Sequence, residues 1–114
     1  MTRRLTMAIL AATLMMTASA PVALAADPKE IPITIENNKF SPDEIKVKAG
    51  EPFVLVVTNK DKSPEEFESK DLRIEKVVPA GKTMKIRVRA LKPGTYPFVG
   101  EYHEQTAKGR IIAE

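Results

Sequence analysis

The sequence predicts an all-β fold, a sandwich or barrel of antiparallel strands with Greek-key connections. Short runs that alternate apolar and polar residues recur through residues 26–114, and such runs are typical of strands with one buried face. Turns rich in Pro and Gly separate the runs, as at Pro79-Ala80-Gly81 and Lys92-Pro93-Gly94. This part of the chain has no sustained helical period. Short strands at close spacing favour an antiparallel sandwich or barrel.

The amino-terminal segment has the pattern of a secretory signal. Arg3 and Arg4 precede an apolar run from Leu5 to about Met16, and Ala23-Leu24-Ala25 provides the small residues after which signal peptidase cuts. We expect residues 1–25 to be a cleaved signal peptide and residues 26–114 to form one small domain in the periplasm. An uncleaved membrane anchor is the alternative, but polar residues interrupt the run before the roughly 20 apolar residues that a span needs.

The domain is expected to consist of consecutive strands separated by turn signals. The segment 53–57 is a continuous run of β-branched and aromatic residues, as expected for a strand that is buried on both faces or has one face under a loop. The others alternate or lie between turn signals. In chain order, we predict strands over residues 31–36, 45–49, 53–57, 84–88 and 109–113. Residues 66–68 are expected to be extended, with Glu66 and Glu68 on one side and Phe67 opposite them, in the core.

Charge and cysteine content exclude several classes of function. The formal charge of +3 falls by two when Arg3 and Arg4 leave with the signal, and the other basic residues alternate along strands, so we expect no nucleic-acid partner. The chain has no Cys and therefore neither a disulfide nor a thiolate ligand. Met84 shares a strand face with Ile86 and Val88, which indicates core packing. The sequence has no nucleophile paired with a base and no phosphate-binding Gly loop.

The segment from Gly94 to Gly109 is similar to the loop that closes a metal site in the cupredoxin family. There, an aromatic strand ends in Cys, a His follows, and an axial Met precedes a Gly. In this chain Tyr96 and Phe98 match the aromatics of that strand. Gly100 stands at the Cys position, His103 at the His position and Ala107 at the Met position. The resemblance implies a cupredoxin-like antiparallel Greek-key β-sandwich or barrel that has lost the type 1 blue copper centre.

Other motifs extend this resemblance over most of the domain. A Phe-x-Pro turn followed by a strand and Ala-Gly, an Asn-x-Asp segment and a Pro-x-Gly turn occur at residues 40–54, 59–61 and 78–81. In a cupredoxin the first copper-binding His follows a Pro soon after Asn-x-Asp, whereas here Pro64 is followed by the carboxylates of Glu65, Glu66 and Glu68. An immunoglobulin-like sandwich is the alternative fold of the same class.

A narrower resemblance concerns function. Residues Glu66, Phe67, Glu68, Glu75 and Tyr96 match a Cys-lacking, carboxylate-rich type of cupredoxin-like protein associated with periplasmic bacterial iron uptake. This resemblance implies a protein that handles iron or copper ions beside an inner-membrane iron permease or a periplasmic iron-binding protein. A ferroxidase-like step, in which copper takes an electron from Fe(II), is implied if both ions bind in neighbouring positions.

The candidate metal ligands are His103, Glu66, Glu68 and Glu101, with Glu65 and Glu75 ranked below them. Carboxylates with one imidazole suit iron, Mn(II), Cu(II) or Zn(II), whereas sulfur ligands select Cu(I). A shared cation would relieve the repulsion among the acids of residues 61–75. Counting from Pro64 aligns Glu65 with the missing His, whereas the carboxylate-rich pattern selects Glu66 and Glu68. Both registers stay open.

The ordinary alternatives also stay open. The lone His103 and the acids can be a solvated loop and a solvated sheet face. In that case the alternative to metal binding is that the chain is a non-redox accessory domain, which binds a protein partner through its acidic loop. The native metal and a homodimer are not determined by the sequence.

Overall fold

The computed structural model describes residues 11–19 and 27–114. The predicted signal peptide, residues 1–25, lies outside the described residues except for 11–19, which form neither helix nor strand. In the two described stretches, no helix is long and apolar enough to cross a membrane. The signal and its cleavage therefore stay a prediction.

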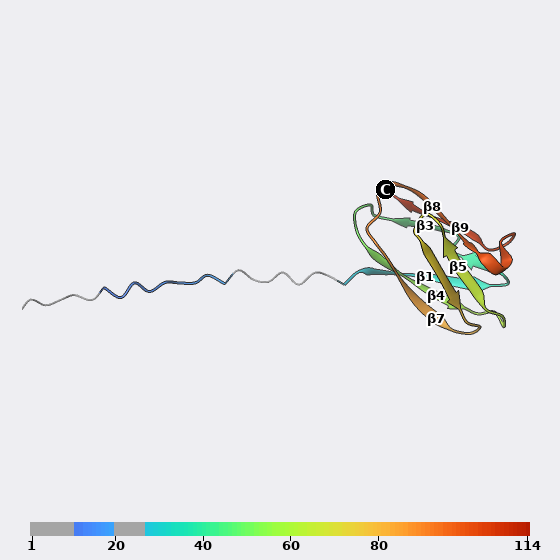
Figure 1. Ribbon diagram of the computed structural model, residues 1–114, viewed down its shortest axis with the longest axis horizontal. Helices are drawn as coiled ribbons and strands as arrows, with labels where there is room; N and C mark the ends of the chain where they lie inside the picture. Colours follow the sequence, from blue (N-terminus) through green and yellow to red (C-terminus); the bar gives the residue numbers. More distant parts are fainter. Residues whose placement is uncertain (1–10, 20–26) are drawn as a thin grey trace, which may run out of the picture.

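Residues 27–114 form two β-sheets with one short 3-10 turn (Figure 1). One sheet has the strand order β2-β1-β4-β7 and the other the order β3-β9-β8-β5-β6. The prediction of an all-β sandwich is confirmed. The elements in chain order are β1 (Lys29–Glu36), β2 (Lys39–Ser41), β3 (Glu44–Val47), β4 (Phe53–Asn59), β5 (Glu65–Ser69), β6 (Ile74–Val78), β7 (Thr83–Val88), β8 (Gly94–Gly100), η1 (Glu101–His103) and β9 (Lys108–Ala113).

Both sheets are mixed, which corrects the purely antiparallel arrangement that the sequence predicts. Strands β1 and β4 pair in parallel, as do β3 and β9, and the remaining pairs are antiparallel. After β1 and β2 the chain crosses to the other sheet to form β3. It then returns to the first sheet on the free side of β1 and runs in the same direction.

The inner faces of the two sheets enclose one apolar core. Three phenylalanine rings lie at its centre: Phe40 and Phe67 each contact Phe98, with ring centroids 5.0 Å apart in both pairs. Phe67 is fully buried, as its place opposite Glu66 and Glu68 predicts. Met84 packs against this core, so its predicted role in packing is confirmed.

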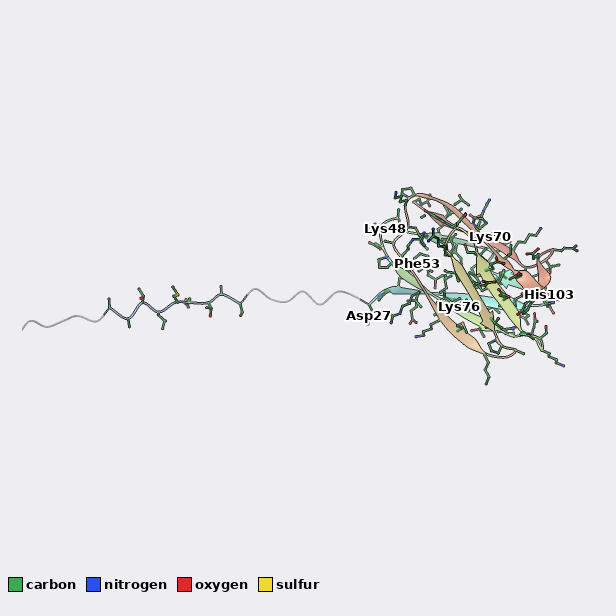
Figure 2. The ribbon with its side chains drawn as sticks, in the orientation of Figure 1. Asp27, Lys48, Phe53, Lys70, Lys76 and His103 are labelled. Carbon is green, nitrogen blue, oxygen red and sulfur yellow. The ribbon has the colours of Figure 1, made fainter. Side chains whose placement is uncertain are left out.

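The loop from η1 to β9 closes one end of the sandwich. It is tied by backbone hydrogen bonds, in which Gly100 N donates to Ala107 O at 2.9 Å and Ala107 N donates to His103 O at 2.8 Å. His103 lies at this end, far from Phe53 at the opposite end (Figure 2). Strand β5 pairs with β8 through Phe67 and Gly100, so its acidic residues lie beside the closing loop.

Candidate metal centre

The acidic residues of strand β5 lie on two opposite faces of the sheet. Glu65, Phe67 and Ser69 point into the sandwich, and Glu65 is only 1% exposed. Glu66 and Glu68 alternate with them and point outward. The structure therefore decides between the two registers that the sequence left open. Glu65 lies in the interior, whereas Glu66 and Glu68 lie on the outer surface.

The interior carboxylate of Glu65 has three hydrogen-bond donors. Its Oε1 accepts the backbone N–H groups of Glu66 and Tyr102, both at 3.0 Å. Its Oε2 lies 2.6 Å from Nδ1 of His103. Glu65 therefore joins its own strand to η1 and the closing loop, and it holds the imidazole in place.

Small residues make room for this carboxylate. A Cβ atom placed on Gly100 would lie 2.6 Å from Cδ of Glu65 and 2.7 Å from Cβ of Ala107, far inside van der Waals contact. Ala107 is fully buried. Residues 65, 100, 103 and 107 therefore converge on one point, and the Glu65 carboxylate fills it.

A second acidic group lies outside the sandwich. Glu66 on β5, Glu75 on β6 and Glu101 in η1 have carboxylate oxygens within 4.8 Å of one another; we call these three residues the carboxylate cluster. Glu68 lies at its margin, directly across the β5–β6 pair from Glu75. Carboxylate oxygens this close together could share one cation.

Glu66 is the buried member of the carboxylate cluster, with 8% of its surface exposed. Hydrogen bonds to Glu75 and then Glu101, which require a shared proton, raise the pKa of Glu66 to about 7, and burial adds to the shift. Burial, followed by the charge of Glu101, raises the pKa of Glu68. Such shifts arise when like charges are held together without a counter-ion.

No cationic side chain of the domain neutralises the carboxylate cluster. The ion pairs found in residues 27–114 involve other acids, namely Glu51, Glu30, Glu65 and Glu44. Buried charge without a partner is costly, so a proton or a metal ion is needed at Glu66.

The structure brings the predicted site residues together as two neighbouring groups. Glu65 and His103 form the interior pair, while Glu66, Glu75 and Glu101 form the cluster with Glu68 at its margin. Asp61 is not part of either group, because its carboxylate accepts the backbone N–H groups of Asn37 and Asn38. Sequence reasoning missed the role of Gly100, although a Gly at the position of a lost ligand is a signal that a neighbouring side chain needs the space.

We expect the melting temperature of the metal-free protein to fall as the pH rises from about 5 to about 8. Glu66 has a pKa of about 7 in the folded protein against 4.5 as its ordinary value. The folded state therefore binds more protons in this window, and its stability decreases as pH rises through it. The raised pKa of Glu68 acts in the same direction. Thermal unfolding with a chelator present, monitored by circular dichroism, measures the slope.

The variant Glu66→Gln should lose most of this slope, because it carries no titrating carboxyl. The control variant Glu51→Gln removes an exposed acid that pairs with Lys48 and should keep the slope. A wild-type melting temperature that is constant or rises over this range would contradict a shared proton in the carboxylate cluster.

The sequence profile of the "Cupredoxin-like domain" family matches residues 6–113. The chain belongs to the cupredoxin-like domain family. An uncharacterized protein of Rickettsia prowazekii (strain Madrid E) is 41% identical over 83 residues, which cover 73% of this chain and 66% of that protein. The chain therefore matches slightly less than two thirds of that relative's length.

Solved structures show the same fold. Auracyanin A, a "blue" copper protein from Chloroflexus aurantiacus, superposes with a TM-score of 0.66 at 14% identity, covering 76% of this chain and 99% of auracyanin A. The metal binding domain of the Cu(I)-exporting P-type ATPase CopA of Streptococcus pneumoniae D39, solved with Cu(I), gives 0.67 at 18% identity, covering 81% and 91%. Both likenesses establish the cupredoxin-like fold.

The interior of this cupredoxin-like domain does not fit a type 1 copper ion. A blue copper site needs a Cys thiolate with two His ligands and a weak axial ligand, and this chain has no Cys and a single His. Nδ1 of that His is bonded to Glu65, and the carboxylate occupies the space that Gly100 and Ala107 leave open. The carboxylate cluster outside, in contrast, offers only oxygen donors, which suit harder cations.

Proposed function

We propose that this cupredoxin-like protein binds an iron or Cu(II) ion at the carboxylate cluster of Glu66, Glu75 and Glu101. The observation that supports this most is the meeting of three carboxylates from three separate elements within 4.8 Å. Glu66 is nearly buried there and its strongest interactions are with other acids. A metal ion would replace the shared proton and remove the repulsion. Glu68 and His103 are the adjacent groups that can complete the ligand set.

We further propose that the bound ion is cargo or reactant in metal uptake. The chain would act in the periplasm beside an inner-membrane iron permease or a periplasmic iron-binding protein. Oxygen donors stabilise Fe(III) relative to Fe(II), because anionic ligands interact more strongly with the more highly charged ion. The resemblance of residues 66–68 and 75 to the carboxylate-rich iron-uptake type supports this role, and a permease gene beside the gene for this protein would be the first thing to look for.

Metal titration tests the binding proposal. We expect the purified protein to bind about one or two equivalents of Cu(II) or iron without an intense blue band, with an apparent affinity that increases as the pH rises through about 7, where Glu66 loses its proton. Glu66→Gln should weaken the affinity at least about tenfold. His103→Ala should also weaken it at least about tenfold, because the loss of a ligand costs no less than the loss of the residue that orients it. Calorimetry and electron paramagnetic resonance provide the readouts.

The matched control is Glu51→Gln, which makes the same change of charge away from the carboxylate cluster and should bind like the wild type. Equal affinities for Glu66→Gln and wild type would exclude the carboxylate cluster as the binding site. If the amount of bound metal falls as the ionic strength rises, the metal is held only by nonspecific attraction to the acidic side chains of the surface.

A second candidate is an accessory domain that binds a protein partner at the same surface. The observation in its favour is that the two exposed large hydrophobic residues of the domain, Val77 and Tyr102, both flank Glu66. Val77 lies opposite Glu66 in the β5–β6 register. Burial, followed by the charge of Glu66, raises the pKa of Tyr102, which places the two side chains near each other. Val77→Ser together with Tyr102→Ser should leave metal affinity unchanged under the first proposal and should abolish partner capture under the second.

A further inference from the structure

The proton between Glu65 and His103 can be assigned from the hydrogen bonds around it. Oε1 of Glu65 accepts two backbone N–H groups, and such donors favour the charged carboxylate. A charged carboxylate only accepts hydrogen bonds. The bond of 2.6 Å between Oε2 and Nδ1 therefore requires that Nδ1 of His103 carries the proton and donates it.

In the neutral imidazole the other ring nitrogen, Nε2, is then the one with a free lone pair. In the described part of the chain the only side-chain hydrogen bond of His103 is the one to Glu65, and no buried side-chain nitrogen or oxygen lacks a partner. Nε2 is therefore open to solvent, in agreement with the 30% exposure of this side chain.

The surroundings of the imidazole are suited to a cation. His103 lines an open hollow of about 530 Å³ together with Asn38 and residues 101–106. Glu101 also lines this hollow and is a member of the carboxylate cluster. A carboxylate on one nitrogen of an imidazole orients the ring and increases the basicity of the other nitrogen as a ligand.

We propose that Glu65 is a positioning residue that fixes His103 in the Nδ1–H tautomer, so that Nε2 is the ligand atom for a transition-metal ion bound beside Glu101. The inference rests on the proposed metal-binding function and adds to it the ligand atom and the residue that selects this atom. Glu65 itself does not touch the metal.

The single His allows a direct test. Long-range proton–nitrogen correlation spectra of the full-length, metal-free protein, recorded above the titration of the imidazole, report which ring nitrogen carries the proton. We expect the Nδ1–H tautomer in wild type and in the control Glu51→Gln. In Glu65→Gln the amide can donate or accept, so the tautomer should become mixed or reversed, and Zn(II) affinity should decrease about tenfold or more.

Titration with Zn(II), a diamagnetic probe, completes the test. We expect the Nε2 signal to shift while Nδ1 keeps its proton. An Nε2–H tautomer in the metal-free wild-type protein would overturn the inference. This measurement needs no variant, so it stays decisive even if Glu65→Gln fails to fold. Zn(II) bound at the carboxylate cluster with unchanged imidazole signals would also overturn it, while leaving the proposed function intact. Absence of Zn(II), Cu(II) and iron binding would instead overturn the proposed function.

Discussion

Replacing Glu65 by Ala is expected to destabilise the protein by about 4 kcal/mol, because it breaks a buried hydrogen-bonded pair and leaves its donors unsatisfied. The backbone N–H groups of Glu66 and Tyr102 and the Nδ1–H of His103 all lose their acceptor. The closing loop loses its attachment to β5 at the same time. Chemical denaturation of the metal-free protein measures the change.

Glu65→Gln is the matched variant for this prediction, since it keeps the shape and one acceptor oxygen. We expect it to lose less than half as much stability as Glu65→Ala. The exposed change Glu51→Ala should cost less than about 0.5 kcal/mol. A loss below about 1 kcal/mol for Glu65→Ala would show that the interior carboxylate is dispensable for the fold.

Gly100→Ala is expected to lower stability by about 3 kcal/mol through overpacking. The added Cβ would approach Cδ of Glu65 to 2.6 Å and Cβ of Ala107 to 2.7 Å. Neither neighbour can move away cheaply: Ala107 is fully buried, and the Glu65 carboxylate is held by three donors. Thermal and denaturant unfolding, with the same control Glu51→Ala, provide the measurement.

A double-mutant cycle connects these two predictions. Combining Gly100→Ala with Glu65→Ala removes the clash, so the double variant should be clearly more stable than the sum of the single losses implies. Additive losses would show that the Cβ of residue 100 does not compete with Glu65 for space. The positions converge in the structure, and strong coupling is therefore the expected result.

Much of the fold could be predicted from sequence because its strands are strongly patterned. The alternation of residues 31–36 and 84–88 and the apolar run 53–57 correspond to β1, β7 and β4. Strands β2 and β6 were not predicted. β2 has only three residues, and β6 is an edge strand in which only Val78 is buried, so neither has a periodic signal.

The residues of the candidate site could be found from sequence, but their grouping could not. The alternation of β5 places Glu65 on one face and Glu66 on the other, and this depends on a register of one residue. The meeting of Glu75 and Glu101 with Glu66 depends on the pairing of β5 with β6 and on η1 following β8, which are contacts between distant parts of the chain. Local sequence patterns do not carry that information.

The parallel pairing of β3 with β9 has a consequence for how the domain folds. Strand β3 lies at the edge of its sheet as the structure describes it and pairs with β9, with residues 44–47 facing residues 110–113. Contacts of such large sequence separation slow folding, because a long loop must close before they form. A nascent chain in which residues 108–113 are still missing cannot complete this sheet. Strand β9 therefore closes the sheet late in folding, and deleting residues 108–113 should prevent cooperative folding.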